Sequence, residues 1–260
     1  MSDDEPTGRG GDVKRIVSAG RRGRWVAVGT IAVLAVVSPF WAPLYALLEI
    51  APLFHEVVGV DVSHHQGSID WRAVKSAEVE FAYIKATEGG DFHDPTFERN
   101  WKEAQAAGVL RGAYHFFTQC RSGLEQARNF IARVPVDRSA LPPVVDAEHM
   151  GPCRDGPSVA DVAAELAAFI EAVAKHFGRR PLIYTTREFD DAYLAGRFGT
   201  ERFWIRSLVL PPRFRRDQWV FWQYHNLGRR EGVARPIDLN VFRGSPADLA
   251  AFATGRPHSP

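Results

Sequence analysis

Two carboxylic acids follow an apolar run in the segment PPVVDAEHM, residues 142–150. Asp146 and Glu148 are separated by one alanine, and the two valines before them are typical of a strand. Residues two apart in a strand point to the same face, with Cα atoms roughly 6.5 to 7 Å apart. Like charges this close raise the pKa of one partner, so one acid can stay protonated while the other is ionised. This is an arrangement for acid catalysis, although a lone D-x-E pair is also common in solvated loops.

The elements around this pair alternate between strands and helices. In DPTFERNWKEAQAAG, Asp94 is the predicted N-cap and Gly108 the stop, and SVADVAAELAAFIEAVAKHFG is capped by Ser158 and closed by Gly178. The strand candidates are VVGVDV, FAYIKA, RGAYHFF, PPVVDAE, PLIYTT, RFWIRS, WVFWQYH and IDLNVF. This alternation predicts an α/β fold, a modified TIM-type barrel of about eight strands with fewer helices. A doubly wound open sheet is the alternative.

Polar residues collect where the predicted strands end, which is where barrels of this type build their active sites. These residues are Asp61, Ser63, Lys85, Glu88, Tyr114, His115, Asp146, Glu148 and Tyr184. The sequence therefore predicts a single pocket that several strands supply with acids and aromatic side chains.

Six segments in chain order carry a resemblance to a known family. They are GVDVSHHQGSIDW from Gly59, YIKATEGGDFHDPTF from Tyr83, AQAAGVLRGAYHFF from Ala104, the D-x-E pair, FWQY from Phe221 and IDLNVF from Ile237. In this order the segments resemble the glycoside hydrolase family 25 lysozymes, the Chalaropsis-type muramidases, over residues 58–252.

The resemblance implies a modified barrel that cleaves the β-1,4 bond between N-acetylmuramic acid and N-acetylglucosamine in peptidoglycan without a cofactor. Glu148 matches the family's proton donor. Asp146 matches the partner that is proposed to steer the substrate's own 2-acetamido group as it attacks the anomeric carbon. Asp61 and Asp238 match two further acids that line the floor of the site. An acetamido nucleophile explains why no separate protein nucleophile is needed.

Aromatic residues near the predicted strand ends are candidates for contact with sugar rings. Tyr114, Tyr184, Trp204 and Tyr224 are the predicted substrate-binding aromatics, although aromatic strand residues are equally common in cores. Gln223 is the neighbour of Tyr224, so at most one of these two faces the site. Glu88 is expected either to contact substrate or to pair with Lys85.

One segment departs from the family. After FWI the chain has Arg206, Ser207 and Leu208, where many members have an alanine followed by polar or aromatic residues. This departure favours an alternative, a catalytically inactive peptidoglycan-binding or envelope scaffold protein with the same barrel. A hydrolase of chitin-like polymers is a further alternative, which the D-V-S and D-L-N motifs disfavour.

Metal binding and nucleic-acid binding are both disfavoured. His64 and His65 lie near Asp61, but adjacent strand residues face opposite sides and would not easily chelate one ion. The formal net charge of +1 gives no basic excess for nucleic acid. Cys120 and Cys153 are the only cysteines and are predicted to form a disulfide in an oxidising compartment, the alternative being two unrelated thiols.

The N-terminal region predicts a membrane anchor. Residues 1–24 are polar and become basic, and residues 25–48 contain no charged residue, which is long enough to cross a bilayer. A linker (49–57), the catalytic barrel (58–254) and a tail (255–260) would follow on the extracytoplasmic side of the cytoplasmic membrane, because basic residues precede the apolar run. A cleaved signal peptide and a buried core helix are the alternatives. Protein partners cannot be deduced.

Overall fold

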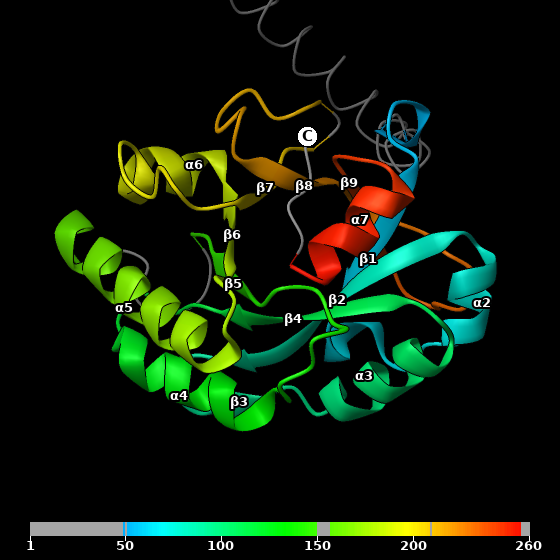
Figure 1. The fold of residues 1–260 in the computed structure, drawn as a ribbon, viewed down its shortest axis with the longest axis horizontal. Coiled ribbons are helices and arrows are strands. Elements are labelled where there is room, and N and C mark those ends of the chain that lie inside the picture. The colour runs from blue at the N-terminus through cyan, green and yellow to red at the C-terminus, as the bar shows by residue number, and fades with distance from the viewer. Residues whose placement is uncertain (1–48, 50, 150–156, 209, 256–260) are drawn as a thin grey trace, which may run out of the picture. The chain divides into compact units, whose positions relative to one another are not determined.

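The computed structural model describes residue 49 and residues 51–149, 157–208 and 210–255 of the chain. In this part of the chain eight strands form a barrel, and a ninth, short strand makes a hairpin beside them (Figure 1). The barrel strands are β1 (Val57–Val62), β2 (Val79–Glu88), β4 (Leu110–Phe116), β5 (Val144–Ala147), β6 (Leu182–Thr186), β7 (Phe203–Arg206), β8 (Trp219–Gly228) and β9 (Ile237–Phe242), and the hairpin strand is β3 (Phe92–His93).

The pairing of β1 closes the sheet. This strand pairs with β2 on one edge and with β9 on the other. The barrel strands β1, β2, β4, β5, β6, β7 and β8 are parallel to one another along the sheet, and β9 is antiparallel to both β8 and β1. The predicted barrel of about eight strands is confirmed, and the open-sheet alternative is wrong. Because β9 runs the opposite way, its first residues reach the rim at which the parallel strands end.

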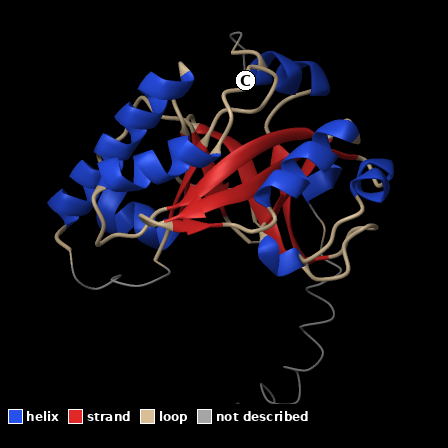
Figure 2. Cartoon of the chain, turned by 90° about the horizontal axis from the view of Figure 1, so that it is seen from below, coloured by secondary structure: helices blue, strands red, loops and turns tan. Residues whose placement is uncertain are grey.

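In the described part of the chain, the α-helices that flank the barrel are fewer than its strands. They are α2 (Trp71–Ser76), α3 (Phe97–Ala106), α4 (Gly123–Arg133), α5 (Val159–Phe177), α6 (Arg187–Phe189) and α7 (Pro246–Ala253), with the short helical turns η1 (Ala51–Leu53), η2 (His64–Gln66) and η3 (Asp190–Leu194). In Figure 2 they surround the strands on either side. Among the described residues, the connections from β7 to β8 and from β8 to β9 contain no helix, in agreement with the prediction of a barrel with fewer helices.

Of the two predicted N-caps, the one of α5 is confirmed and the one of α3 is wrong. The Ser158 side chain accepts a hydrogen bond from the backbone of Asp161, and Gly178 ends α5 in the left-handed region at φ 66°. At α3 the prediction is wrong, because the N-cap is Thr96 and not Asp94. The Asp94 carboxylate instead accepts hydrogen bonds from the backbone and side chain of Thr96 and from the backbone of His64.

Side-chain alternation divides the apolar residues into two clusters. The outer cluster fills the space between strands and helices and includes Ile84, Ile183 and Phe169. The inner cluster fills the barrel itself, below the rim where the parallel strands end; its largest members are Phe81, Tyr83, Trp204, Phe221 and Phe242. Each barrel strand therefore has one face in each cluster.

Glycine in β4 makes room for this inner packing. A Cβ atom on Gly112 would lie 2.3 Å from the Tyr83 ring of the neighbouring strand β2. Only a residue without a side chain fits there, so the glycine allows a large aromatic ring to occupy the narrow barrel interior.

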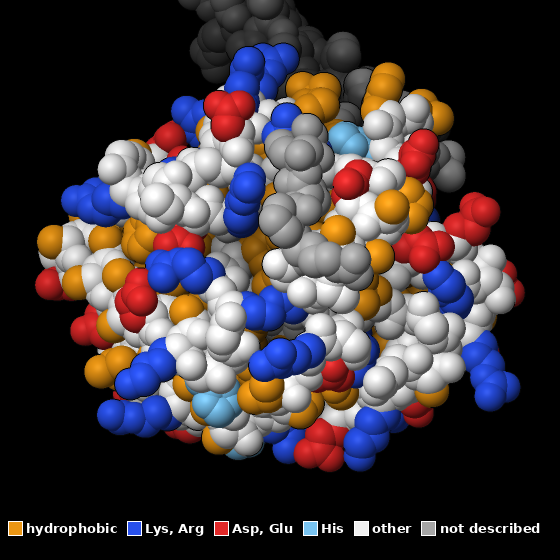
Figure 3. All heavy atoms as spheres, in the orientation of Figure 1, with side chains coloured by type: hydrophobic (Ala, Val, Ile, Leu, Met, Phe, Trp, Pro, Cys, Tyr) orange, Lys and Arg blue, Asp and Glu red, His pale blue; other side chains and the backbone are white. Residues whose placement is uncertain are grey.

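Helix α7 closes the end of the barrel opposite the rim where the parallel strands end. The Arg179 guanidinium donates to the carbonyl oxygens of Ala140, Phe252 and Ala253 at 2.7 to 2.8 Å, which fixes the end of this helix to the loop before β5. Figure 3 shows basic and acidic side chains interspersed over the face that carries α7, in agreement with the small net charge.

No helix among the described residues is both long enough and apolar enough to cross a membrane. The predicted cytoplasmic segment (1–24) and anchor (25–48) lie outside the described residues, so the anchor stays a prediction.

Candidate active site

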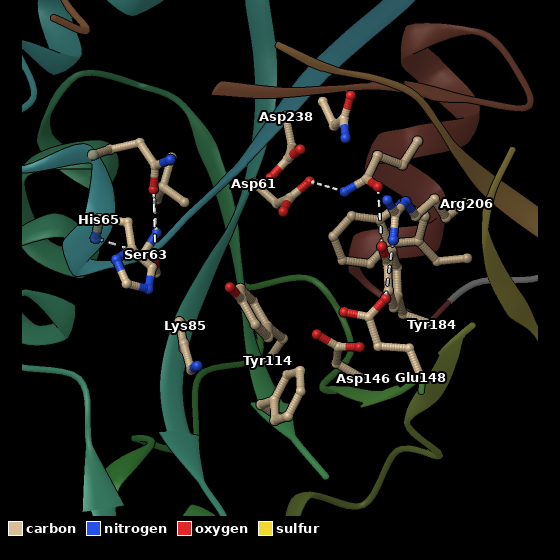
Figure 4. A pocket seen from close by; sticks show the side chains of 16 residues that line it. Asp61, Ser63, His65, Lys85, Tyr114, Asp146, Glu148, Tyr184, Arg206 and Asp238 are labelled. Carbon is tan, nitrogen blue, oxygen red and sulfur yellow. Dashed lines mark hydrogen bonds and ion pairs between the residues drawn. The ribbon is translucent and has the colours of Figure 1, made fainter. Parts of the chain in front are cut away.

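A pocket of about 300 Å³ opens at the rim where the parallel strands end. Its lining comes from β1, β2, β4, β5, β6, β7, β8 and β9 and from the residues that follow β1 and β5. The lining residues are Asp61, Val62, Ser63, His65, Gln66, Lys85, Tyr114, Phe116, Asp146, Glu148, Tyr184, Trp204, Arg206, Gln223, Asn226 and Asp238. All four acids predicted from the sequence are therefore brought together in one pocket (Figure 4).

Asp61 and Asp238 form the first acid pair. They are register partners across β1 and β9, and their side chains share a hydrogen bond. Burial raises the pKa of Asp61, and burial followed by the charge of Asp61 raises the pKa of Asp238 well above its usual range. The arrangement suits one shared proton, with Asp238 as the donor to Asp61.

Two amide side chains also hold Asp61. Its Oδ2 atom accepts from Nδ2 of Asn240 at 2.8 Å and from Nε2 of Gln223 at 3.0 Å. Oε1 of Gln223 accepts in turn from the Tyr184 hydroxyl at 3.0 Å. A chain of hydrogen bonds thus runs from β6 through β8 to β1 and fixes the orientation of Asp61.

Asp146 and Glu148 form the second acid pair, at the end of β5. Burial, followed by the charge of Glu148, raises the pKa of Asp146 well above its usual range. The Oδ1 atom of Asp146 is buried and has no hydrogen-bond partner among the described residues. A buried carboxylate oxygen without a donor is unusual, and it leaves the Asp146 carboxyl group with unused hydrogen-bonding capacity at the edge of the pocket.

Glu148 lies next to a cation. Nη1 of Arg206 is 3.3 Å from Oε2 of Glu148, and Figure 4 shows the two side chains facing one another above Asp146. Burial raises the pKa of Glu148, and the neighbouring guanidinium opposes that rise. The net upward direction suits a carboxyl group that must carry a proton to a leaving group.

The predicted aromatic residues divide into three groups by position. Tyr114 is half-buried and lines the pocket. Tyr184 also lines the pocket, and its hydroxyl donates a hydrogen bond to Gln223. Trp204 is only 2% exposed, lies against the Tyr83 ring at 4.9 Å between centroids, and donates from Nε1 to Asn240. It therefore forms the floor of the pocket and presents little of its ring to a ligand.

Two predicted substrate contacts lie elsewhere. Tyr224 belongs to the outer cluster, beside Trp222, because its neighbour Gln223 takes the inward position. Glu88 lies outside the pocket lining and pairs with Lys85, whose Nζ is 2.6 Å from Oε2 of Glu88. This is the ion-pair alternative, and Lys85 itself reaches the pocket.

The sequence prediction named neither Asn240 nor Arg206 as a site residue, and of the neighbours Gln223 and Tyr224 it named Tyr224. Asn240 lies two residues after Asp238 in β9, and Arg206 two residues after Trp204 in β7. The same strand alternation that linked Asp146 to Glu148 could have indicated both residues.

The remaining predictions concern cysteines and metals. Cys120 is exposed in the loop after β4, and Cys153 lies outside the described residues, so the disulfide stays a prediction. Within the described ranges, no group of three or more histidine, cysteine, aspartate or glutamate side chains could hold a metal ion. His64 binds the Asp94 carboxylate through Nδ1 at 2.9 Å.

Comparisons with known proteins agree with this geometry. The profile of the glycosyl hydrolases family 25 matches residues 60–233, from within β1 to the loop before β9. Lysozyme M1 of Streptomyces globisporus is 38% identical over 211 residues, which are 76% of this chain and 71% of that protein.

Two solved structures share the fold. A family 25 glycosyl hydrolase from Bacillus anthracis superposes with a TM-score of 0.72 at 40% identity, over 76% of this chain and 94% of that one. A bacterial lysozyme from Streptomyces coelicolor superposes with a TM-score of 0.70 at 38% identity, over 77% of this chain and 98% of that one. With the acids gathered in the pocket at the strand ends, these matches show that the chain belongs to glycosyl hydrolase family 25 and is a lysozyme-type glycosidase.

Proposed function

We propose that this protein is a muramidase that hydrolyses the β-1,4 bond between N-acetylmuramic acid and N-acetylglucosamine in peptidoglycan. The family membership and the likeness to named lysozymes support peptidoglycan as the substrate. The single observation that carries the residue assignment is the second acid pair, in which Glu148 has a raised pKa and Asp146 has an unpartnered buried oxygen.

Glu148 is assigned as the general acid and base. In the first step it gives its proton to the glycosidic oxygen as the bond to the anomeric carbon breaks, and in the second it takes a proton from the attacking water. A pKa raised by burial keeps the acid protonated before the first step. Arg206 can then stabilise the carboxylate that the proton transfer leaves behind, since its guanidinium already faces Oε2.

Asp146 is assigned to the substrate's 2-acetamido group. Asp146 lines the pocket and its buried Oδ1 atom has no donor among the described residues, so the carboxyl group has the capacity to accept a hydrogen bond from the acetamido N–H. That bond would orient the acetamido oxygen toward the anomeric carbon, and an Asp146 that gives up its proton as the positive charge develops would stabilise that charge. Asp61 and Asp238 then shape the floor of the site and add negative potential beneath the developing oxocarbenium ion.

Product analysis tests this proposal. Full-length protein in detergent is incubated with peptidoglycan and, separately, with chitin, and the soluble products are identified by mass spectrometry. We expect muropeptides that end in reducing N-acetylmuramic acid, and no release from chitin. Products that end in reducing N-acetylglucosamine would show that the other glycosidic bond is cut and would overturn the assignment.

A catalytically inactive peptidoglycan-binding protein is the second candidate. The observation in its favour is the ion pair of Arg206 with Glu148, because a cation at 3.3 Å stabilises the ionised form of the proposed acid. Binding to insoluble peptidoglycan in a pelleting assay, with no release of soluble products at any pH between 4 and 8, would favour this candidate.

We further propose that residues 25–48 anchor the protein in the cytoplasmic membrane, with the barrel outside the cytoplasm and a Cys120–Cys153 disulfide in the exported part. The uncharged run and the basic residues before it support this topology. Alkaline phosphatase fused after residue 260 should be active, because this enzyme folds only where disulfides form. A fluorescent protein that folds only in the cytoplasm should be dark at the same position. The reverse pattern would overturn the topology.

A further inference from the structure

A second pocket of about 530 Å³ adjoins the catalytic pocket, and Arg206 lines both. It lies between the start of α6 and the loop that leads from β7 toward β8. Its lining residues are Thr186, Arg187, Glu188, Arg206, Ser207, Leu208, Leu210, Pro211, Arg213 and Phe214. We call it the arginine pocket. Nothing in the assignment of the acids uses it, and its size is ordinary for a ligand site.

The charge of the arginine pocket is positive. Three guanidinium groups line it against one carboxylate, that of Glu188. Arg187 forms an ion pair with Asp191, with Nε 2.6 Å from Oδ2, and its guanidinium lies over the Phe214 ring. The Arg213 side chain is exposed and has neither an ion pair nor a hydrogen bond with any residue that the structure describes. Arg213 is therefore the cation with the greatest freedom to bind an anion.

Arg206 lies between the two pockets, and most of its N–H donors make no hydrogen bond to the described residues. A guanidinium has five N–H donors, and among the described residues the side chain of Arg206 donates only one hydrogen bond, from Nη1 to Glu148. A planar, forked donor of this kind suits a carboxylate. An anion in the arginine pocket would therefore meet Arg206 on the side away from Glu148.

The walls of the arginine pocket are apolar. Leu208, Leu210, Pro211 and Phe214 supply them, and Leu210 is 57% exposed. A purely charged polymer such as a polyol phosphate would leave these walls without a partner, whereas a short peptide with aliphatic side chains and free carboxylates matches both the walls and the guanidinium groups.

The proposed substrate carries such a peptide. In peptidoglycan, the lactyl group of N-acetylmuramic acid is joined to a short stem peptide, so a sugar bound in the catalytic pocket brings its stem within reach of a neighbouring cavity. We propose that the arginine pocket binds the carboxylate-bearing stem peptide through Arg206 and Arg213, which makes the protein selective for glycan strands that keep their stems. This inference rests on the proposed muramidase function.

A comparison of two substrates tests the inference. Glycan strands with stems, and the same strands stripped by an amidase, are digested by the wild type, by Arg213→Gln and by Arg202→Gln. Arg202 is the matched control, because it is an exposed arginine just before β7, at the opposite end of that strand. We expect the ratio of kcat/KM for stem-bearing strands to kcat/KM for stripped strands to fall about tenfold in Arg213→Gln, because roughly one charge-assisted contact is lost. In Arg202→Gln this ratio should stay at the wild-type value.

The outcomes separate the two proposals. Cleavage of both strands by the wild type at the same kcat/KM, or an unchanged ratio in Arg213→Gln, would overturn the stem site while leaving the muramidase intact. Failure of the wild type to cleave either strand would overturn the muramidase and the stem site together. A third arm uses strands freed of phosphate-containing polymers by acid. If this treatment, and not amidase treatment, removes the preference, the anion is a phosphate and the stem assignment is wrong.

Discussion

The two acid pairs of the pocket differ in what surrounds them. Asp61 lies opposite Asp238 and accepts hydrogen bonds from two amide side chains. Asp146 has a buried oxygen with no partner among the described residues. Within the same residues, the Glu148 carboxylate has one long contact, with Arg206 at 3.3 Å, and the side-chain amide of Gln119 donates to the Glu148 backbone carbonyl. Asp61, Asp146 and Glu148 are buried and Asp238 is half-buried, so the pairs differ mainly in their hydrogen-bond partners.

This difference separates the part of the site that the fold completes from the part that it leaves incomplete. A buried carboxylate oxygen without a donor costs about 1 to 3 kcal/mol, and that cost is removed when a ligand supplies the missing N–H. The first pair can thus hold its shape in the empty enzyme, whereas the second pair reaches its best hydrogen bonding only with substrate. The same contrast predicts that removing a direct donor to Asp61 acts mainly on stability, whereas substitutions within the second pair lower turnover.

The largest effect is expected for Glu148→Gln. The amide keeps the shape of the side chain but cannot donate a proton to the leaving oxygen, so kcat on peptidoglycan should fall by about 10² to 10⁴. The measurement is the initial rate of reducing-end release, with Glu103→Gln, an exposed glutamate on α3, as the control. A Glu148→Gln protein with more than a tenth of the wild-type rate would remove Glu148 from the role of general acid.

Asp146→Asn should lower activity and raise stability together. The folded-state pKa of Asp146 is raised, so the folded protein binds this proton more tightly than the unfolded chain does. The stabilisation is complete below the unfolded pKa near 3.8 and is lost as pH rises toward the folded pKa. The asparagine variant has no such pH dependence, so it should be more stable than the wild type at higher pH. Asparagine also lacks one acceptor oxygen for the acetamido group, so we expect kcat to fall about a hundredfold.

Thermal unfolding from pH 4 to pH 8 tests the stability part of that expectation. The Tm of Asp146→Asn minus that of the wild type should grow with pH across this range. A constant difference would mean that Asp146 is not held in its protonated form by the fold, and the contrast between the two acid pairs would be lost.

Asn240→Ala should act mainly on stability. Asn240 is fully buried, donates to Asp61 and accepts from Nε1 of Trp204 at 2.8 Å. The truncation leaves the indole N–H without an acceptor and Asp61 with one donor fewer, which should reduce the free energy of unfolding by about 3 kcal/mol. Urea titration measures the change, and Gln105→Ala on the exposed face of α3 is the control. A loss no larger than that of the control would show that the first pair does not depend on this amide.

Arg206→Gln should change the pH dependence of the reaction. The guanidinium opposes the upward shift in the pKa of Glu148, so its removal should let that pKa rise further. The alkaline limb of the kcat profile should then move to higher pH, because Glu148 must be protonated to act as the acid. Arg197→Gln, an exposed arginine after η3, is the control. An unmoved limb would mean that Glu148 does not set it.

The sequence predicted the barrel and the pair of Asp146 and Glu148 because both depend on local patterns, whereas Asp238 came from the resemblance to the family. Strand runs, capping residues and the spacing of Asp146 and Glu148 follow from near neighbours in the chain, and the closed barrel followed from counting such runs. The partners of the acids depend on register between strands that are far apart in sequence. Nothing near Asp61 indicates that Asn240, 179 residues away, would donate to it. Thr96 displaced Asp94 as the N-cap of α3 for a similar reason, since Asp94 is also held by His64, 30 residues away.

Two tyrosines give the finest test of the difference between the inner and outer faces of the barrel. Both were predicted to contact sugar, but the Tyr184 hydroxyl lies in the pocket and donates to Gln223, whereas Tyr224 lies among the outer core residues, with its hydroxyl 3.5 Å from Nη2 of Arg230. Tyr184→Phe breaks the hydrogen-bonded chain to Asp61 and should lower kcat/KM about tenfold, the equivalent of one net hydrogen bond. Tyr224→Phe removes only a long contact outside the pocket and should leave kcat/KM within about twofold of the wild type. If Tyr224→Phe were the more damaging of the two, the outward position of this residue would be wrong, and with it the register that turns Gln223 into the pocket.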